Sequence, residues 1–442
     1  MKIPGSIFIS NTTLPKEELT MATQPKTAIL IGAGPRGRLA YLNHFMNEGV
    51  KIVAVADLIP ENVRMVKDQC GIADDMCFLD YHDMLKLGKL ADAAIICTND
   101  RDHMEPFRIC AEQGYHILLE KPVSPFPEEV AEIDQIAKNY DKTIMICHVL
   151  RYAPFFQKLK EIIDSGVIGK VMSINYSENM AWWFGTSSFV RGNWRNSNTT
   201  SPIILAKCCH DMDMLVYLTG KKCKKVSSFG DLSYFKAECA PEGAGTRCTI
   251  DCKIEKECPY SARRIYVEDV PEVIRFSRQK DYTETKEQKL ADLATIDVGR
   301  CVFACDNNVC DHQILAMEFE DNILATFHLN AFNYNQARTI KICGTMGELG
   351  GNAETGEISL QLFSEKEPRK FVEKGKEGQS HGGGDLGIVK SFIASMQGDG
   401  SSNLTSARET LHSHMICFAA EESRKRGGEM VQLEEFTAQF TN

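Results

Sequence analysis

The sequence lacks the features that place a protein in a membrane or on nucleic acid. None of its apolar runs approaches the roughly 18 residues that a membrane-spanning helix needs. Its 442 residues carry a formal net charge of -10, and the acidic residues are spread along the chain without any basic block. Nucleic acid and anionic membranes attract clustered positive charge, so neither is an expected partner.

The beginning of the sequence shows no export signal. Residues 1–25 contain only a short apolar patch, unlike the core of a signal peptide, and we expect an N-terminal arm there. In a long chain that is not exported, the 17 cysteines predict reduced thiols or metal ligands in place of disulfides. The expected location is therefore the cytoplasm.

From Lys26 onward, strand-like and helix-like segments alternate. Short apolar runs rich in β-branched residues predict strands, and the segments between them have helical apolar spacing. The predicted strands lie at 27–34, 50–57, 91–98, 115–122 and 142–148. Such alternation predicts a parallel, doubly wound sheet covered by helices. We assign this Rossmann domain to residues 26–147.

A glycine pattern lies where the first predicted strand meets the first predicted helix. Gly32, Gly34 and Gly37 fit G-x-G-x-x-G, and Asp57 closes the next strand about 20 residues further on. In a dinucleotide site the glycines allow a tight turn, close approach to the pyrophosphate and close helix packing, while the acid binds ribose hydroxyls. Asp57 is followed by Leu58, Ile59 and Pro60, with no nearby cation for a 2′-phosphate, so NAD is favoured over NADP, and Arg36 is a candidate phosphate ligand.

A second polar motif follows the strand predicted at 115–122. Glu120, Lys121 and Pro122 lie at the carboxyl edge, where open α/β sheets bind ligands. Taken alone, a surface ion pair explains Glu120 and Lys121 equally well.

Several motifs in order resemble the Gfo/Idh/MocA oxidoreductases. They are "GAGPRG", Asp57, "CTNDRDH", "EKP", "HVLRYAPFF" and "KCCHDMDML". The resemblance extends over nearly the whole chain from Lys26. It implies a second α+β domain, here residues 148–442, built on an open antiparallel sheet, and the strand-like segments at 316–333 and 338–351 agree with such a sheet.

The resemblance also implies a catalytic pair. Lys121 should reach the reacting hydroxyl and the nicotinamide, and His210 should transfer the proton. The family pattern resembles D-x-G-x-H-x-x-D, whereas this chain has Ala206 and Cys208 at the first two marked positions and retains His210 and Asp213. A histidine titrates near working pH and a lysine can hold a developing alkoxide by charge, so we expect this chemistry without the usual aspartate.

Further ligand-binding residues are predicted from the resemblance and from local composition. Aromatic rings and guanidinium groups suit a sugar ring with hydroxyl or acidic substituents. Core packing of the tryptophans and an interdomain salt bridge at Arg151 remain alternatives. The cofactor candidates are Thr98, Asn99, His103 and Glu120, and the substrate candidates are Arg151, Tyr152, Trp183, Arg195, Lys207 and Asp211.

The glycine-rich segment at 380–384 opens a predicted helix. We interpret it as a loop and helix cap, with Asp385 as a further substrate candidate. The other interpretation is that His381 and Asp385 enter the pocket.

An insertion at about residues 239–310 carries closely spaced cysteines. Thiolates can hold a structural zinc ion, which would stabilise a segment with a small core. The spacings are looser than the usual C-x2-C, so free buried thiols are the alternative. The candidate metal ligands are Cys248, Cys252, Cys258, Cys301 and Cys305.

Together these features predict an NAD-dependent oxidoreductase that acts on a secondary hydroxyl of a sugar, glycoside or inositol-like polyol. The resemblance further implies a homo-oligomer, either a dimer or a tetramer. Two alternatives remain open. One is an NAD-dependent glycosidase that oxidises C3 transiently and eliminates the aglycone. The other is a sugar or nucleotide sensor without turnover, which the absent aspartate at position 206 favours.

Overall fold

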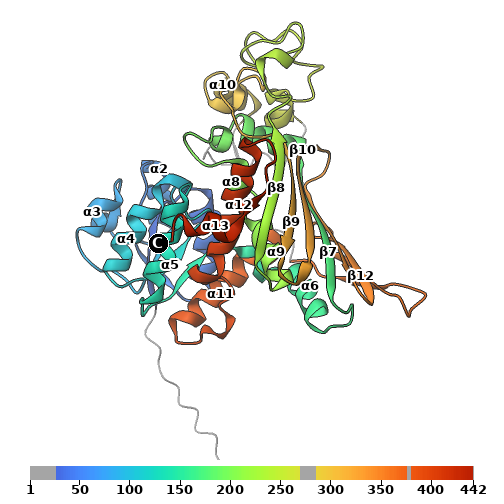
Figure 1. Cartoon of the computed structure of the whole chain (residues 1–442). Coiled ribbons are helices and arrows are strands. Elements are labelled where there is room, and N and C mark those ends of the chain that lie inside the picture. The colour runs from blue at the N-terminus through green and yellow to red at the C-terminus, as the bar shows by residue number, and fades with distance from the viewer. Residues whose placement is uncertain (1–25, 269–284, 376–379, 442) are drawn as a thin grey trace, which may run out of the picture.

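The structure is a computed structural model that describes residues 26–268, 285–375 and 380–441. The N-terminal arm predicted at residues 1–25 lies outside the described residues. Two sheets face each other across a layer of helices (Figure 1).

The first sheet has six parallel strands. They are β1 (Thr27–Ile31), β2 (Lys51–Ala56), β3 (Cys77–Phe78), β4 (Ala93–Ile96), β5 (His116–Leu119) and β6 (Ile144–Ile146). Their order, β3-β2-β1-β4-β5-β6, reverses direction between β1 and β4, and doubly wound sheets bind ligands at that point. The predicted Rossmann sheet is confirmed.

Two helices of this domain begin at a proline, and one of these two ends at a glycine, as helix-end preferences predict. Pro60 and Pro127 occupy their first positions, where a missing N–H costs nothing, and Gly71 ends the earlier one in a left-handed conformation. The helices of the domain are α1 (Asn43–Asn47), α2 (Pro60–Cys70), α3 (Tyr81–Leu85), α4 (Met104–Glu112) and α5 (Pro127–Lys138).

The second sheet has nine strands in the order β14-β13-β12-β11-β7-β10-β9-β8-β15. The predicted antiparallel sheet is confirmed, except that β7 and β10 pair in parallel, which the long connection between them permits. The strands are β7 (Val171–Ala181), β8 (Cys223–Asp231), β9 (His312–Phe319), β10 (Leu324–Asn333), β11 (Ala337–Gly344), β12 (Gly347–Asn352), β13 (Glu357–Leu362), β14 (Arg369–Val372) and β15 (Val431–Gln432).

Helices cover the face of the second sheet that looks toward the first domain (Figure 1). Among them α12 contacts α9, α5 and β8, so it joins the two domains. The remaining helices are α6 (Pro154–Asp164), α7 (Trp182–Gly185), α8 (Ile203–Ala206), α9 (Cys209–Thr219), α10 (Lys286–Leu293), α11 (Gly384–Met396), α12 (Ala407–Lys425) and α13 (Leu433–Ala438).

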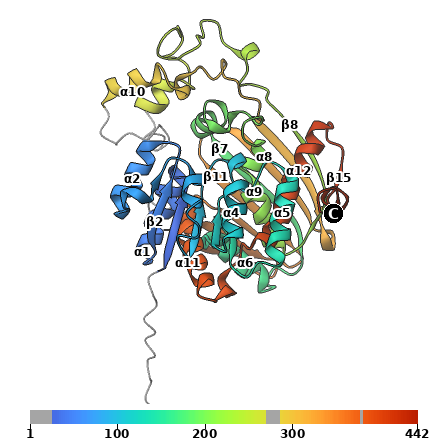
Figure 2. The ribbon, with the colours of Figure 1, turned by 90° about the vertical axis from the view of Figure 1, so that its left-hand side faces the viewer.

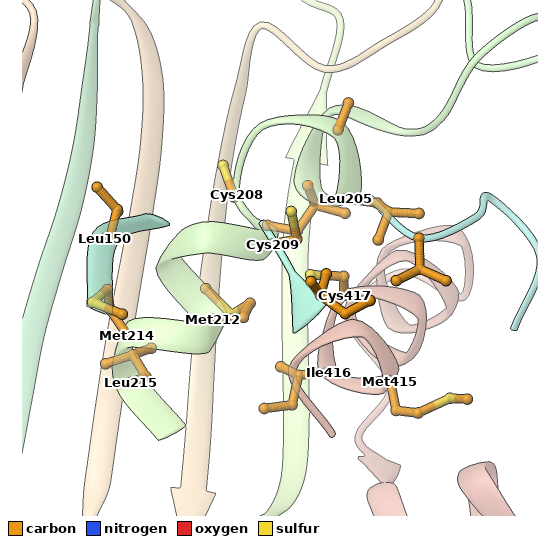
Figure 3. Close-up of a cluster of buried hydrophobic side chains, with 14 of the residues drawn as sticks. Leu150, Leu205, Cys208, Cys209, Met212, Met214, Leu215, Met415, Ile416 and Cys417 are labelled. Carbon is orange, nitrogen blue, oxygen red and sulfur yellow. The ribbon is translucent and has the colours of Figure 1, made fainter. Parts of the chain in front are cut away.

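The contact between α9 and α12 is an apolar cluster rich in sulfur (Figure 3). Flexible methionines and small thiols fill irregular gaps well, and fully burying one large apolar side chain stabilises a fold by about 1.5–3 kcal/mol. This packing fixes the first turn of α9. The cluster includes Leu205, Cys208, Cys209, Met212, Met214, Leu215, Met415, Ile416 and Cys417.

The insertion with α10 projects beyond one end of the second sheet in both views (Figures 1 and 2).

Among the described helices, none combines the length and the apolar composition needed to cross a lipid bilayer.

Candidate functional site

Gly32 and Gly34 lie in the turn between β1 and the helical segment η1 (Arg36–Leu42), and Gly37 is the second residue of η1. Gly32 has a φ of +86°, and a Cβ there would lie 2.5 Å from the carbonyl carbon of Cys97. A Cβ on Gly37 would overlap the Gly32 carbonyl oxygen, whereas one on Gly34 would have no heavy atom within 4 Å. Two glycines thus permit close packing and the third leaves open space, as a dinucleotide phosphate turn requires.

Asp57 immediately follows β2 and lies beside this turn. Its Oδ2 accepts the N–H of Ala33 at 2.7 Å, while Oδ1 accepts the N–H of Ile59 at 2.8 Å and Nδ2 of Asn62 at 3.1 Å. These bonds hold the carboxylate where Rossmann domains bind the ribose.

Arg36 is bound by two buried carboxylates. Its Nε donates to Glu120 Oε1 at 2.6 Å, and its Nη2 donates to Asp385 Oδ1 at 3.0 Å. Glu120 also accepts the hydroxyl of Tyr41 at 2.6 Å. Burial alone would raise the pKa of Glu120, but the charges of Arg36 and Lys121 hold it below its usual value. Arg36 therefore links the glycine turn to β5 and α11.

The other predicted cofactor residues follow β4. Thr98 Oγ1 donates to the Asp102 carbonyl oxygen at 2.9 Å, and Asn99 is exposed. The ring nitrogens of the buried His103 lie 2.7 Å from the Pro122 carbonyl oxygen and 3.1 Å from that of Thr98. His103 thus holds together the turns that follow β4 and β5.

Lys121 and His210 come from different domains and lie close enough for the charge of Lys121 to act on the imidazole. Lys121 follows β5, and its Nζ donates at 2.8 Å to the carbonyl oxygen of Ala206, the last residue of α8. His210 lies in the first turn of α9 and is 2% exposed. Burial lowers the pKa of His210 well below its ordinary value, and the charge of Lys121 lowers it further. A neutral imidazole can accept a proton, and the nearby ammonium can stabilise an alkoxide.

His210 belongs to a chain of four histidine rings. The centroid of its ring lies 5.8 Å from that of His148 and 5.5 Å from that of His381, and the rings of His148 and His414 are 5.3 Å apart. Within the part of the chain that the structure describes, both ring nitrogens of His148 and of His210 are buried without a hydrogen-bond partner. His148 opens the "HVLRYAPFF" motif but was not predicted as a site residue, and nothing in the sequence around His414 separates it from a core histidine.

A network of charged side chains adjoins His210. Arg338 on β11 donates from Nε to Asp211 Oδ1 at 2.7 Å, and its Nη2 lies 2.8 Å from Glu178 Oε2. Lys207 Nζ lies 3.5 Å from Glu178 Oε1. Burial raises the pKa of Asp211 and lowers that of Lys207. Sequence analysis predicted Lys207 and Asp211 but missed Glu178 and Arg338, which lie within strands and outside any motif.

The side chains of Arg151 and Tyr152 bind other parts of the second domain, so the ion pair of Arg151 lies within that domain and not between the two domains. Arg151 makes two hydrogen bonds to the Asp213 carboxylate, at 2.8 and 2.7 Å, and both side chains are buried. The hydroxyl of Tyr152 accepts the N–H of Leu404 at 3.0 Å.

Trp183 and Arg195 lie against the insertion. Trp183 packs with an apolar cluster that includes Cys248 and Leu293. Arg195 donates from Nε to Asp306 Oδ1 at 2.8 Å. Trp183 also packs on Phe184, with ring centroids 6.0 Å apart, and Lys207 Nζ lies 4.9 Å from the centre of the Phe184 ring. The roles of Trp183 and Arg195 in substrate binding stay a prediction.

The predicted zinc site is not supported. All five cysteines are free thiols, and no three His, Cys, Asp or Glu side chains among the described residues could together hold a metal ion. The buried guanidinium of Arg191 lies beside Cys248. Its Nη2 is 3.8 Å from Cys248 Sγ and 2.5 Å from the Tyr260 carbonyl oxygen. A fixed positive charge beside the sulfur disfavours a metal cation there. Burial instead raises the pKa of Cys301 to about 11, as expected of a core thiol.

A Rossmann sheet with an open glycine turn and a second α/β domain define a dinucleotide-binding protein of two domains. A family model described as "Oxidoreductase family, NAD-binding Rossmann fold" matches residues 26–148, and one described as "Oxidoreductase family, C-terminal alpha/beta domain" matches residues 160–433. The chain belongs to this family, the Gfo/Idh/MocA oxidoreductases.

Curated relatives are distant. The putative oxidoreductase YteT of Bacillus subtilis is 22% identical over 318 residues, which cover 69% of this chain and 72% of the relative. The myo-inositol 2-dehydrogenase of Thermotoga maritima is 25% identical over 205 residues, 46% of this chain and 58% of the relative. The 2,7-anhydro-N-acetylneuraminate hydratase of Mediterraneibacter gnavus is 27% identical over 205 residues, 46% of this chain and 51% of the relative.

The fold is also found among solved structures. An oxidoreductase from Agrobacterium radiobacter, solved with NAD+, L-tartaric acid and magnesium, superposes with a TM-score of 0.66 at 14% identity. The superposition covers 93% of this chain and 99% of that one.

Proposed function

We propose that the protein is an NAD-dependent oxidoreductase that oxidises or reduces a secondary hydroxyl of a sugar, glycoside or inositol-like polyol. The observation that carries the proposal is the convergence of Lys121, at the carboxyl end of β5, with His210 at the start of α9. The similarity to a myo-inositol 2-dehydrogenase supports the substrate class.

The residues present fit a dinucleotide. The open space at Gly34 admits a pyrophosphate, Asp57 would bind the ribose, and Arg36 would lie near the phosphates. When bound, NAD supplies the hydride acceptor or donor. The carboxylate of Asp57 disfavours a 2′-phosphate, so NAD is the expected form.

The chain's own residues would handle the oxygen and its proton. Lys121 would bind the substrate hydroxyl and stabilise the negative charge that develops on oxygen. His210, kept neutral by burial, would accept the hydroxyl proton during oxidation and return it during reduction. Lys207, Asp211 and Arg338 would bind further hydroxyl or acidic groups of the substrate.

A panel of sugars, glycosides and cyclic polyols with NAD and with NADP tests the proposal. Absorbance of the reduced nucleotide and product mass are followed together. We expect one class of polyol to yield NADH and a product two hydrogens lighter, and NADP to be poorer. A protein that binds NAD and oxidises none of these compounds would contradict the proposal.

A second candidate is glycoside cleavage or hydration through transient oxidation at C3. The similarity to a 2,7-anhydro-N-acetylneuraminate hydratase favours it. Oxidation of one carbon acidifies the neighbouring C–H bond, so a leaving group can be eliminated before the carbonyl is reduced again. The same panel distinguishes this route, because product forms without accumulation of NADH.

The alanine at position 206 keeps a third candidate open, a sensor without turnover. Lys121→Ala and His210→Ala would then leave the biological effect intact, whereas Asp57→Ala would abolish it.

A further inference from the structure

His381 lies beside His210, and Asp385 lies beside His381, although both follow His210 by more than 170 positions. His381 belongs to the helical turn η12 (Ser380–Gly383), and Asp385 lies in the first turn of α11. The ring of His381 packs on that of His210, with centroids 5.5 Å apart and planes inclined by 53°. Ala206, which adjoins Lys121, offers no side chain that could exchange a proton. The nearest additional imidazole therefore comes from the C-terminal part of the chain.

Asp385 orients the ring of His381. Nδ1 of His381 lies 3.2 and 3.3 Å from the two carboxylate oxygens of Asp385, which also binds Arg36. Burial alone would raise the pKa of Asp385, but Arg36 and His381 hold it well below its ordinary value. The ionised carboxylate favours a proton on Nδ1 and leaves Nε2 for another partner.

The exposure of His381 differs from that of its neighbours. Its side chain is 26% exposed, whereas His210 and His148 are buried with unpartnered ring nitrogens. His381 also has a φ of +51°, a left-handed conformation that costs free energy in a residue other than glycine. Such backbone strain concentrates at functional positions. Of the four neighbouring histidine rings, His381 is the one that contacts His210 and is also exposed to solvent.

We propose that His381, oriented by Asp385, carries protons between His210 and solvent. The inference rests on the proposed function, because it supplies the proton path for the same site. During oxidation the substrate O–H bond breaks and its proton moves to His210, while the carbinol hydrogen leaves as a hydride to the dinucleotide. The two rings are in contact without a direct hydrogen bond, so His210 passes a proton to His381 through a bridging water, and His381 releases one proton to solvent. Both rings end neutral, and no other reactant is consumed.

The charges around His381 suit this transfer. Burial lowers its pKa, as do the charges of Arg36 and Arg338, whereas Asp385 raises it and His210 lies against the ring. Asp385 can stabilise the imidazolium while it exists. Because the pKa of His381 remains below its ordinary value, the ring releases the proton readily at neutral pH.

The kinetic test compares His381→Ala with His44→Ala, a histidine on α1 in the first domain. With a substrate from the panel, we expect His381→Ala to lower kcat by about tenfold or more and to leave the affinity for NAD unchanged. Added imidazole should restore kcat in proportion to its concentration, because it replaces a missing proton carrier. Unchanged kcat in His381→Ala, or a loss that imidazole does not restore, would overturn the inference.

A second measurement needs no substrate. Nitrogen-15 spectra of the histidine rings should show the neutral His381 protonated on Nδ1, and Asp385→Asn should reduce that preference. His381→Ala should also shift the ring signals of His210. A His381 ring protonated on Nε2, with His210 signals that are unaffected by His381→Ala, would overturn the proton path. If no polyol is oxidised, the proposed function fails, and these spectra still decide whether the two rings are coupled.

Discussion

The three glycines of the nucleotide turn have different surroundings although they belong to one motif. Gly32 and Gly37 are packed against backbone, so any side chain there displaces the turn. Gly34 faces open space, so a methyl group there meets only what binds in it. Alanine at Gly37 therefore tests how tightly the turn is packed, whereas alanine at Gly34 tests what binds in the open space.

We expect Gly34→Ala to leave the free energy of unfolding within about 0.5 kcal/mol of wild type and to weaken NAD binding about tenfold or more. Gly37→Ala is the matched control, and overpacking should destabilise it by about 1–3 kcal/mol. Urea unfolding and calorimetric titration with NAD measure the two effects. Wild-type NAD affinity in Gly34→Ala would show that the pyrophosphate does not bind at this turn.

Buried histidines should make stability depend on pH. Burial lowers the pKa of His414 to about 3 and that of His412 to about 4. Below the ordinary pKa of about 6.5, the unfolded chain binds protons that the folded chain excludes, so stability falls as pH falls through this range. At pH 5, each of these two histidines should lower the free energy of unfolding by about 2 kcal/mol relative to pH 7.5.

Urea unfolding at both pH values checks this expectation with His414→Gln. A glutamine oxygen can still accept the N–H of Val123, which donates to Nε2 of His414 at 3.1 Å, but the side chain does not titrate. The variant should lose less stability on acidification than wild type, by about 2 kcal/mol. An unchanged pH dependence in His414→Gln would contradict the assignment.

At the scale of elements, α9 connects packing with chemistry. His210 faces the site, while other side chains of the same helix enter the sulfur-rich cluster against α12 (Figure 3). The position of the imidazole thus depends on apolar contacts that take no part in proton transfer.

Leu215→Ala should destabilise the protein by about 2–5 kcal/mol, because Leu215 is fully buried and its truncation leaves a cavity. Val216→Ala, at a partly exposed position of the same helix, is the control and should cost less. Chemical unfolding of both variants gives the difference. Equal costs would mean that the cluster does not hold α9 as described.

The elements of the first domain were largely predictable. Each long strand is an apolar run bounded by turn residues, so residues 27–34 and 50–57 predict β1 and β2. β3 has only two residues, Cys77 and Phe78, and leaves no periodic signal. In the second domain, the parallel pairing of β7 with β10 depends on the path of a long connection, which no local pattern specifies.

The site was predictable where a motif marks it. Lys121 and His210 were predicted from short patterns that resemble a family. His381 was interpreted as part of a loop and cap, because its contact with His210 spans the C-terminal half of the chain. Arg36 was assigned to the cofactor alone, because its carboxylate partners, Glu120 and Asp385, are distant in the sequence.

At the scale of the whole molecule, the second sheet has one helix-covered face and one bare face among the described residues (Figure 1). Phe229 and Ile314 lie opposite each other on neighbouring strands and are 56% and 50% exposed. Adjacent exposed apolar residues of this kind mark interaction surfaces. We propose that this face pairs two copies of the chain.

The double variant Phe229→Ser, Ile314→Asp should be monomeric at concentrations where the wild type is a dimer or tetramer. Light scattering during size-exclusion chromatography measures the mass. Gln69→Ser, a change at an exposed position on α2 in the first domain, is the control and should keep the wild-type mass. A monomeric wild type, or an unchanged mass in the double variant, would contradict this proposal.

The central claim is that Lys121 and His210 form the proton-transfer pair beside a dinucleotide. The most direct test is kcat/KM for NAD-dependent oxidation in Lys121→Met and His210→Asn, with NAD affinity measured on the same samples. The account predicts that each variant loses about 10²- to 10⁴-fold in kcat/KM while NAD affinity stays within about threefold of wild type. Wild-type turnover in either variant with NAD bound would contradict it.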